Sequence, residues 1–546
     1  MSFLQLVRRE MHGSMPKLLF MSGVGGISNA SILAAINAGV QDASSGQKPG
    51  LWAASLFLVA LFLFMRSQQY VTITATAEIE AIIHKLRLRI MDMIRRSELL
   101  EMEKIGRARI VAAVTSDTAV LTQASNMLCF TVQGAVLIFF AGLYVAYLSL
   151  AAFLLTVVIV SGAATIFHYK NRRLSEQKGE SAAWERRLFD RLTDFLDGFK
   201  EVRLNAARSD DLFADALEVS KTAANIKIRT QAETFKMIVT SQISMYILLG
   251  AVVFIAPNLS SLGGASIAKT TTALLFVVGA CFGLVQSIPI LLNANAAANR
   301  IDRLEQALQS ILIPRERPAI GAPRRFERIE MNNIVFRYTD RFSDTVFKIG
   351  PIDFTLNAGE LVFITGGNGS GKSTFLRVLS GLYPPDSGEI LLDGRPITNA
   401  NRDEYRELVS GIFFDYHLFK RLYGIPEADV ADVNRLLALF RLADKTALTD
   451  GEFRTLDLSG GQRRRLALIV SLLEKRPIML LDEWTAEQDP EFRRKFYDEL
   501  LPEMLRAGAT IVVITHDDRY LDELRLPARR IRMDEGRIVE QRSVGG

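Results

Sequence analysis

The stretch "LVFITGGNGSGKSTFLRVLSGL" at residues 361–382 decides the fold of the second half of the chain. It reads as an apolar strand, a glycine-rich loop and a helix, and residues 366–373 fit the pattern G-x-x-x-x-G-K-[ST] in that setting. Glycines let backbone N–H groups curl around phosphates, and the helix N-terminus adds its positive end. The sequence therefore predicts a nucleotide-binding loop made by Gly366, Gly367, Asn368, Gly369, Ser370, Gly371, Lys372, Ser373 and Thr374.

Two side chains of this loop have expected partners on a nucleotide. Lys372 is expected to reach the β- and γ-phosphates, and Ser373 is expected to ligate Mg²⁺. A chance glycine-rich turn would not combine the lysine, the serine and the flanking strand and helix. ATP and Mg²⁺ are therefore the expected cofactors.

A second apolar strand is predicted at residues 478–481. Two adjacent acids follow it directly, in the stretch "LLDEWTAEQDP" (480–490). Two adjacent acids by themselves usually lie in a solvated loop. Beside a phosphate-binding loop, however, an acid at a strand end lies next to Mg²⁺. Asp482 is therefore predicted to bind the metal, and Glu483 to orient and deprotonate the attacking water.

A third apolar strand, in "ATIVVITHDD" (509–518), is followed by His516, whose imidazole is predicted to sense or hold the γ-phosphate. A lone histidine after a strand is more often structural, but the order of the three motifs favours a functional role. Between the glycine-rich loop and the second apolar strand, the stretch "LDLSGGQRRRLALIVSLLE" (456–474) begins a basic amphipathic helix at Ser459. Read alone, this would be an ordinary helix cap.

The first half of the chain is predicted to cross a membrane. The 546 residues are 49% hydrophobic with a mean hydropathy of +0.17, which is high for a soluble protein and low for an entirely membrane-embedded one. A bilayer core needs about 20 mostly apolar residues per helix. Six segments qualify: 18–40, 51–70, 126–147, 150–168, 237–256 and 271–293. The first is interrupted by glycines and polar residues, which membrane helices tolerate because small residues permit close packing.

Charge in the loops predicts the orientation. The connections at 41–50, 148–149 and 257–270 are short and hold few charges, whereas those at 71–125 and 169–236 are long and basic. By the positive-inside rule, the N-terminus, both long loops and everything after the sixth helix are cytoplasmic. Since topology explains the basic residues behind the net charge of +5, nucleic acid is not an expected partner.

These observations predict a transmembrane domain at 1–308, a linker rich in proline and charge at 309–327, and a nucleotide-binding domain at 328–546. Leu458 to Gln462, "LSGGQ", is too specific for a chance cap and resembles the signature of ATP-binding-cassette proteins. The chain resembles that family from end to end. The resemblance implies a multi-domain membrane protein, with an all-α six-helix transmembrane exporter domain fused to an α/β P-loop nucleotide-binding domain.

In this family two nucleotide-binding domains meet head to tail, so one P-loop and one signature per chain imply a homodimer. The signature residues implied to act on the partner's ATP are Leu458, Ser459, Gly460, Gly461 and Gln462. Tyr338 matches the aromatic that stacks on adenine, although a strand aromatic can also be core. Asp489 matches the acid that couples the two sites, and Glu483 matches the general base. Residues 103–121 and 195–212 resemble the segments that dock on the nucleotide domains and couple ATP to alternating access.

The chain also departs from the family pattern. The expected glutamine in "GIFFDYHLF" (411–419) is replaced by Phe414 or Asp415, which makes Asp415 a candidate metal ligand. Trp484 stands where most cassettes have proline; no catalytic role follows for it, and core packing or interface filling is its expected physical role.

The phrases "DEWTAEQDP" (482–490), "FFDYHLF" (413–419) and "THDDRY" (515–520) are similar to bacterial exporters of cyclic peptides and siderophore precursors, of the pyoverdine, syringomycin and microcin type. The resemblance implies export of a peptide- or siderophore-like molecule across the bacterial inner membrane, among membrane lipids. The alternatives are a lipid or multidrug exporter, or a membrane-anchored regulatory ATPase.

The membrane helices hold amides but no acid or base well inside the bilayer, which argues against a proton-coupled carrier. The amides are Asn29, Asn37, Gln133, Gln242, Gln286 and Asn293. Since such groups more often bond neighbouring helices than ligands, the sequence names no substrate-binding residue.

Overall fold

The structure, a computed structural model, describes residues 3–10, 15–44, 50–255, 264–312, 325–339, 346–425 and 429–544. The chain forms two compact units: residues 1–91 with 108–307, and residues 92–107 with 308–546. Most of the expected linker, residues 313–324, lies outside the described residues. Residues 92–107, which the sequence assigns to a cytoplasmic loop of the transmembrane domain, group with the second unit.

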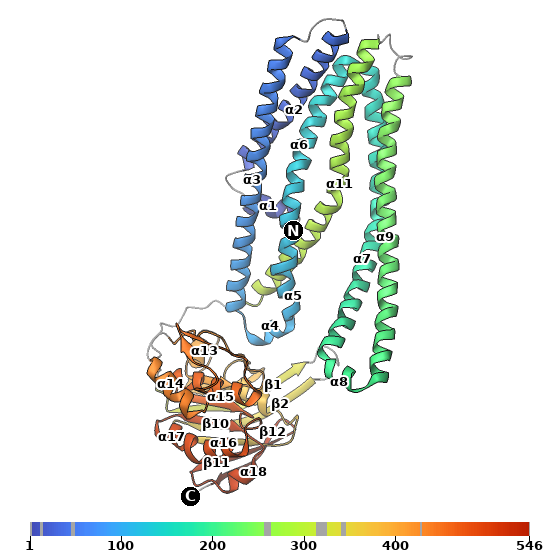
Figure 1. The fold of residues 1–546 in the computed structure, drawn as a ribbon. Helices are drawn as coiled ribbons and strands as arrows, with labels where there is room; N and C mark the ends of the chain where they lie inside the picture. Colours follow the sequence, from blue (N-terminus) through green and yellow to red (C-terminus); the bar gives the residue numbers. More distant parts are fainter. Residues whose placement is uncertain are drawn as a thin grey trace. The chain divides into compact units, whose positions relative to one another are not determined.

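Six long helices make up most of the first unit (Figure 1). They are α2 (Met15–Ser44), α3 (Leu51–Arg95), α6 (Thr118–Leu148), α7 (Leu150–Asp197), α9 (Ala206–Phe254) and α11 (Gly264–Gln309). Each is long and apolar enough to cross a membrane, which confirms the six predicted spans. The helices continue well beyond those spans. At 1.5 Å per residue, the 49 residues of α9 extend about 74 Å, more than twice the thickness of a bilayer core.

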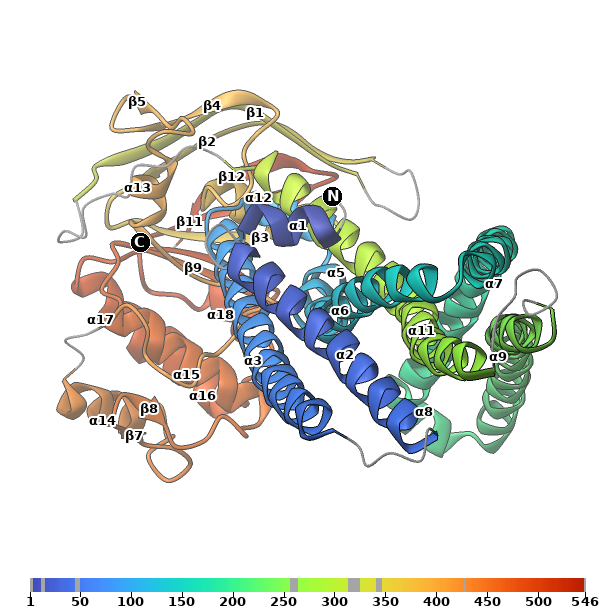
Figure 2. The same ribbon diagram turned by 90° about the horizontal axis from the view of Figure 1, so that it is seen from above.

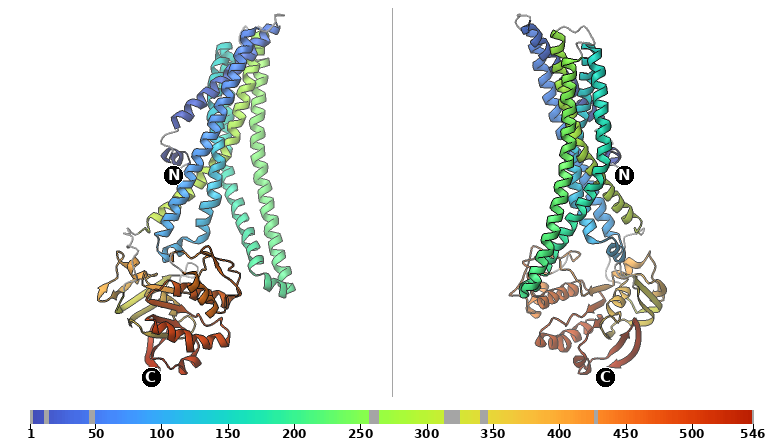
Figure 3. Two further views of the ribbon diagram at one scale, coloured as in Figure 1. Left: turned by 60° about the vertical axis from the view of Figure 1, so that its left-hand side comes forward. Right: turned by 90° about the vertical axis from the view of Figure 1, so that its right-hand side faces the viewer.

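Small residues let these helices approach closely. α7 and α9 run side by side, and α2 packs along α6 (Figure 3). A Cβ atom at Gly26 of α2 would lie 2.2 Å from a side-chain carbon of Val136 on α6, and one at Gly25 would lie 2.8 Å from Ser67 Oγ on α3. Gly25 and Gly26 are therefore packing residues, whereas Gly23 and Gly39 of the same span have no atom within 4 Å of a built Cβ.

Four shorter segments complete the first unit's described helices. They are α1 (Phe3–Glu10), α5 (Arg107–Ala112), the π-helical turn η1 (Ala113–Asp117) and α8 (Phe199–Leu204). A π-turn frees backbone carbonyls from the helix ladder, and Arg87 Nε on α3 donates to Val114 O at 3.2 Å. Arg300 Nε on α11 donates to Asp117 Oδ1 at 3.0 Å. Arginines of two neighbouring helices thus hold the turn in place.

The second unit is built on a six-stranded sheet with the order β12-β11-β3-β10-β9-β6. The strands are β3 (Leu361–Thr365), β6 (Val409–Ile412), β9 (Ile478–Asp482), β10 (Thr510–Ile514), β11 (Ala528–Asp534) and β12 (Arg537–Val544). All neighbours pair in parallel except β11 and β12. β3, β9 and β10 are buried along their whole length, which explains why they read as unbroken apolar runs.

A four-stranded antiparallel sheet, β2-β1-β4-β5, covers one face of the main sheet, and helices cover the other (Figure 2). These strands are β1 (Arg328–Thr339), β2 (Val346–Asn357), β4 (Ser387–Leu392) and β5 (Arg395–Pro396); a small hairpin pairs β7 (Leu448–Thr449) with β8 (Glu452–Phe453). The helices of this unit are α4 (Leu99–Ile105), α12 (Lys372–Leu379), α13 (Arg402–Arg406), α14 (Val430–Leu439), α15 (Gly460–Leu473), α16 (Pro490–Lys495), the π-helical η2 (Phe496–Leu500), α17 (Leu501–Arg506) and α18 (Asp518–Asp522).

Each face of the main sheet has its own apolar core. The core under α14, α15, α16 and α17 includes Trp484, whose side chain has no exposed surface. Its ring centroid lies 4.6 Å from that of Phe496. Core packing, the role expected for this tryptophan, is therefore confirmed.

The segment containing α4 docks on the other core, which includes residues of the main sheet, β1, β2 and α12. Leu99 and Leu100 pack against that core. Glu98 Oε1 accepts a hydrogen bond from Arg406 Nη1 at 3.3 Å, and Tyr383 Oη donates to Glu103 Oε2 at 2.7 Å. Residues 98–103, which reach only the first residue of the expected coupling segment at 103–121, are thus held on the second unit by two carboxylates and two leucines.

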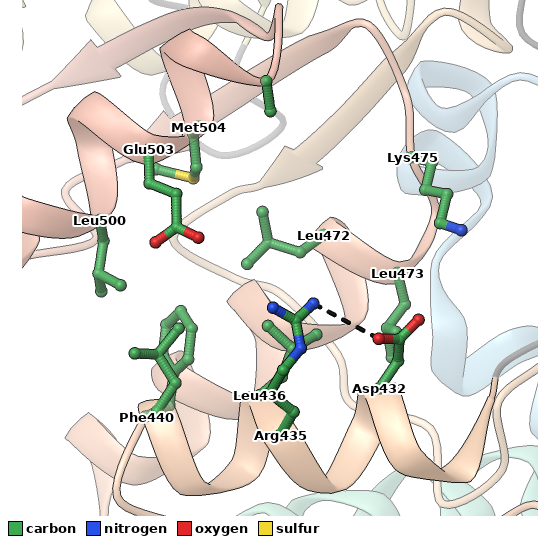
Figure 4. A pocket seen from close by; sticks show the side chains of 12 residues that line it. Asp432, Arg435, Leu436, Phe440, Leu472, Leu473, Lys475, Leu500, Glu503 and Met504 are labelled. Atoms are coloured by element: carbon green, nitrogen blue, oxygen red, sulfur yellow. Dashed lines mark hydrogen bonds and ion pairs between the residues drawn. The ribbon is translucent and has the colours of Figure 1, made fainter.

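An apolar pocket of about 200 Å³ opens between α14, α15 and α17 (Figure 4). Leu436, Phe440 and Leu472 line it, and an ion pair between Asp432 and Arg435, 3.4 Å apart, lies at its edge. None of its lining residues belongs to the predicted nucleotide site. The pocket is a packing gap in the helical part of this unit.

Two valines on α14 allow a matched test of the core. Val433 is fully buried, whereas Val430 is 53% exposed. Val433→Ala is expected to cost about 2 kcal/mol of stability, because two buried methyl groups lose their contacts. This corresponds to a melting temperature lower by about 4 to 8 °C for a domain of this size. Val430→Ala should leave thermal unfolding of the purified protein unchanged, and equal effects of the two changes would contradict the packing described.

Candidate functional site

Three parallel strands end at the same edge of the main sheet. Ile514 of β10 lies opposite Ile364 of β3 on one side and opposite Asp482 of β9 on the other. Because the strands are parallel, the loops after them leave the sheet side by side. The register therefore brings the glycine-rich loop, the acidic pair and His516 together, as the sequence predicts.

Backbone geometry requires glycine at two positions of the glycine-rich loop. Gly366 has φ +146°, and a Cβ there would lie 2.2 Å from Met533 O. Gly371 has φ +95° and precedes the first turn of α12. The loop is fixed from the other side by Gly536 N, which donates to Ser370 O at 3.0 Å. A side chain at Gly366 could not be accommodated without moving β11.

Lys372 curls into the loop. Its Nζ donates to Gly366 O at 3.0 Å and to Gly367 O at 2.9 Å. Burial lowers the pKa of the Lys372 ammonium, and the nearby carboxylates of Glu483 and Asp482 partly oppose this. The ammonium is thus poised at the mouth of the loop, held by backbone carbonyls that a phosphate can replace.

The donor set beside this lysine fits Mg²⁺. Ser373 Oγ donates to Asp482 Oδ1 at 3.2 Å, so a hydroxyl and a carboxylate oxygen lie together at the start of α12. Burial raises the pKa of the Asp482 carboxyl, and the hydrogen bond from Ser373 opposes that rise. Among the described residues there is no group of three or more His, Cys, Asp or Glu side chains that could hold a metal. A P-loop Mg²⁺ needs only such a pair, since phosphates and waters complete its shell.

Glu483 and His516 face each other. Glu483 Oε1 lies 3.2 Å from His516 Nε2, with the glutamate 29% and the histidine 46% exposed. The loops that carry them are also joined, because Thr485 Oγ1 donates to Asp517 Oδ2 at 2.8 Å. Because both side chains are partly exposed, the pair lies outside the apolar cores, and water can reach it.

A cleft of about 490 Å³ gathers most of the predicted residues. It is lined by Phe347, Asn368, Gly369, Ser370, Gly371, Lys372, Ser373, Thr374, Phe414, Asp482 and Glu483. The sequence reasoning missed Phe347. It lies on β2 directly opposite Tyr338 of β1, so the two rings share a face of the sheet. Tyr338 does not line the cleft, but it is 39% exposed beside Phe347, so it is not a core aromatic.

The position of the missing glutamine is taken by Phe414, which lines the cleft. Asp415 does not line it; its Oδ2 accepts from Arg377 Nη2 at 3.1 Å. The structure therefore does not bring Asp415 to the oxygens of Ser373 and Asp482. Phe414 and Asp415 lie in the turn after β6, which is closed by the bond from Tyr416 N to Phe413 O at 3.2 Å, and the turn directs Phe414 to the cleft and Asp415 to Arg377.

The signature sequence starts α15 with a capping box. Ser459 Oγ accepts from Gln462 N at 3.4 Å, and Gln462 Oε1 accepts from Ser459 N at 3.0 Å. Cβ atoms at Gly460 and Gly461 would lie 2.4 and 2.6 Å from atoms of Glu487, so both glycines are packing residues. Leu458 packs against the core under the helices.

The loop of Asp489 lies against this helix start. Gln488 Nε2 donates to Gly461 O at 3.1 Å, and Arg465 Nε donates to Gln488 Oε1 at 2.8 Å. Asp489 caps α16 by accepting from Phe492 N at 2.8 Å, and this bond lowers the pKa of its carboxyl. No signature residue lines the cleft of its own chain. This arrangement supports an action of the signature on another copy's nucleotide.

The comparisons with known proteins agree with this site. Residues 349–486, from β2 through the glycine-rich loop to the loop after Trp484, match the family model of the ABC transporter. The chain is 32% identical to ATP-binding protein SyrD of Pseudomonas syringae pv. syringae, over 98% of this chain and 96% of that protein. The chain belongs to the ABC transporter family. ATP binding and ATP hydrolysis coupled to transport follow from that membership.

Other relatives of this ABC transporter include proteins named for export or for lipid flipping, and also proteins named for import. The probable syringafactin export ATP-binding/permease protein SyfD of Pseudomonas syringae is 33% identical over 39% of this chain and 34% of its own length. The ATP-dependent lipid A-core flippase of Cupriavidus metallidurans is 24% identical over 90% of this chain and 84% of its own. The structure of a bacterial Atm1-family ABC exporter with ATP bound superposes with a TM-score of 0.75 at 19% identity, covering 98% of this chain and 95% of that chain. The predicted fold class, an exporter domain fused to a P-loop domain, is confirmed.

The first two glycines of the glycine-rich loop differ in whether they tolerate a side chain. Gly366→Ala is expected to lower the melting temperature of the nucleotide-free protein by about 5 °C or more, because the new Cβ meets Met533 O. Gly367→Ala meets no atom within 4 Å, and its φ is not positive, so it should melt like the wild type. Thermal unfolding without nucleotide measures both, and similar melting of the two variants would contradict the loop geometry.

Proposed function

We propose that this ABC transporter works as a homodimer that exports a peptide-like molecule, a cyclic peptide or siderophore precursor, across the bacterial inner membrane. The observation that carries the hydrolytic part is the placement of Glu483 Oε1 3.2 Å from His516 Nε2 at the edge of the cleft that holds Lys372 and Ser373. A general base must lie within reach of the water that it activates and of the group that orients it. The contact with His516 supplies the orienting group, and the 29% exposed side chain of Glu483 is open to water.

Each chain's own residues divide the work of hydrolysis. Lys372 and the N–H groups of the loop hold the phosphates, and Ser373 with Asp482 holds the metal. Mg²⁺, when bound, neutralises charge on the β- and γ-phosphates. Glu483 takes the proton of the attacking water, and His516 orients that carboxylate and contacts the γ-phosphate. Tyr338, beside Phe347, offers its exposed ring to the adenine.

The homodimer is supported by what one chain lacks. Its cleft contains a P-loop and no signature residue, while its signature starts α15 away from that cleft. A complete site therefore needs the signature of a second copy. Asp489, which caps α16 and pairs with Arg465 of α15, joins the two sites in this proposal.

The orientation follows from charge. The long basic extensions of α3, α7 and α9 and the nucleotide-binding unit are cytoplasmic, with the N-terminus on the same side. ATP is available only there.

A peptide-like substrate is supported by the identity to SyrD over nearly the full length and by the syringafactin export named for SyfD. A lipid is the second candidate, because the lipid A-core flippase aligns over 90% of the chain. The one buried amide of the first span fits a structural role, since Asn37 Nδ2 donates to Tyr144 Oη at 3.4 Å and to Lys269 O at 3.3 Å. The substrate class is therefore decided by experiment on transport rather than by a named pocket.

Glu483→Gln is expected to lower ATP hydrolysis at least about 100-fold, because the base is lost while its hydrogen bonds to the loop are kept. The variant should still bind ATP and retain it, and transport should stop. Glu491→Gln is the matched control, because Glu491 is 73% exposed and only pairs with Arg441. ATPase and transport assays on the purified protein in proteoliposomes test this. Export that continues in the Glu483→Gln variant would point to a role other than an ATP-driven pump.

The substrate class is tested by stimulation of ATP hydrolysis in proteoliposomes. Syringafactin, as a peptide probe, is expected to stimulate hydrolysis, whereas purified lipid A is not. The Glu483→Gln protein serves as the background. Stimulation by lipid A alone would replace the peptide-like substrate by a lipid. Hydrolysis without transport of either probe would favour a regulatory ATPase.

A further inference from the structure

Glu483 has a backbone conformation that side chains rarely adopt. Its φ is +49°, in the left-handed region where a Cβ crowds the following carbonyl. Such a residue keeps this conformation only when its surroundings hold it there. In this conformation the Glu483 side chain points to His516; at a negative φ it would leave that position.

Two hydrogen bonds of the Glu483 backbone come from its own sheet and loop. Glu483 N donates to Ile514 O at 3.1 Å, and Glu483 O accepts from Ala486 N at 3.2 Å. A third bond reaches Glu483 from outside. The guanidinium of Arg464, on α15, donates to the same Glu483 O through Nη1. This arginine is only 3% exposed.

Trp484, the residue after Glu483, is also hydrogen-bonded to Arg464. Trp484 Nε1 donates to Arg464 O at 2.8 Å, inside the core. Residue 464 thus receives a hydrogen bond on its backbone from residue 484 and gives one from its side chain to residue 483. The second guanidinium nitrogen of Arg464 lies 3.3 Å from Glu487 Oε1, and its Cζ lies 5.7 Å from the centroid of the Phe414 ring.

We propose that Arg464 and Trp484 form a clamp that positions Glu483, a role that rests on Glu483 being the base under the proposed function. The clamp fixes the carbonyl of Glu483 and the ring that follows it, so the carboxylate stays directed at His516. Neither residue touches the reacting atoms; both act through Glu483. The indole N–H explains why tryptophan rather than another large apolar side chain fills this part of the core.

The clamp also connects Glu483 to the helix α15. Arg464 stands two residues after Gln462, on the first turns of the helix that the signature begins. The helix that begins with the signature, which the proposed dimer places against the partner's ATP, is therefore bonded through Arg464 to the base of the same chain's own site. A shift of α15 changes the position of Glu483 directly.

The test uses the full-length protein and separates the hydrogen bonds from packing. Trp484→Phe keeps an aromatic ring and removes only the donor, and Arg464→Met keeps a long side chain and removes the guanidinium. Trp484→Phe is expected to lower kcat for ATP about fivefold, the equivalent of one neutral hydrogen bond. Arg464→Met is expected to lower it tenfold or more, because a buried carbonyl loses a charged donor. KM for ATP and nucleotide binding should change less than about twofold, since the phosphate loop is untouched.

Three controls accompany these variants. Arg435→Met removes an exposed arginine of α14, and Trp52→Phe changes a tryptophan that is 70% exposed, so both should hydrolyse ATP like the wild type. Phe440→Leu loosens the same core away from the clamp and should lower the melting temperature while kcat stays at the wild-type value. In the Glu483→Gln background, Trp484→Phe should cause no further loss, because the clamp acts only through the glutamate.

A kcat of Trp484→Phe equal to the wild type, or a fall in kcat matched by Phe440→Leu, overturns the clamp. So does a further loss in the Glu483→Gln background. If Arg464→Met fails to fold or to bind nucleotide, Trp484→Phe decides alone. Full hydrolysis by Glu483→Gln itself would instead overturn the proposed role of the base, so the two failures are distinguishable.

Discussion

Ile514 pairs with Ile364 on one side and with Asp482 on the other, and this parallel register brings together the glycine-rich loop, the acidic pair and His516. Moving any of the three strands by one residue would turn the side chains that follow it to the other face of the sheet. The register is set by strands whose residues are all buried, so a slip would also misplace the packing of both cores. Catalytic geometry and stability therefore depend on the same pairing.

The sequence predicted the parts of this unit that follow from local pattern. A strand, a glycine loop and a helix are contiguous, so residues 366–373 could be assigned before any tertiary contact was known. The acids and His516 follow apolar runs, which is why their common edge could be inferred. Six apolar segments likewise predicted the six long helices, although not how far each helix continues beyond its apolar segment, since an amphipathic helix and a loop look alike once hydropathy falls.

What the sequence could not supply depends on contacts between distant segments. Phe347 and Tyr338 share a face only because β1 and β2 pair in one register. Arg464 belongs to the basic amphipathic helix that the sequence predicts, and its burial could not be inferred there, because it depends on α15 turning that residue toward the loop of Glu483. Phe414 and Asp415 were equivalent candidates, and the contact of Asp415 with Arg377 separates them. In each case the deciding partner lies on another element.

The docking of α4 has a consequence for how the protein is made. Glu98 and Arg406, which bond to each other, are separated by 308 residues. At a synthesis rate of about 5 to 20 residues per second, roughly 15 to 60 s pass between them. During this time the ribosome adds four of the six membrane helices, while Leu99 and Leu100 have no core to cover them. The first stretch of the nucleotide-binding unit to be synthesised is thus among the last to be folded, and a chaperone or the membrane surface has time to act on it.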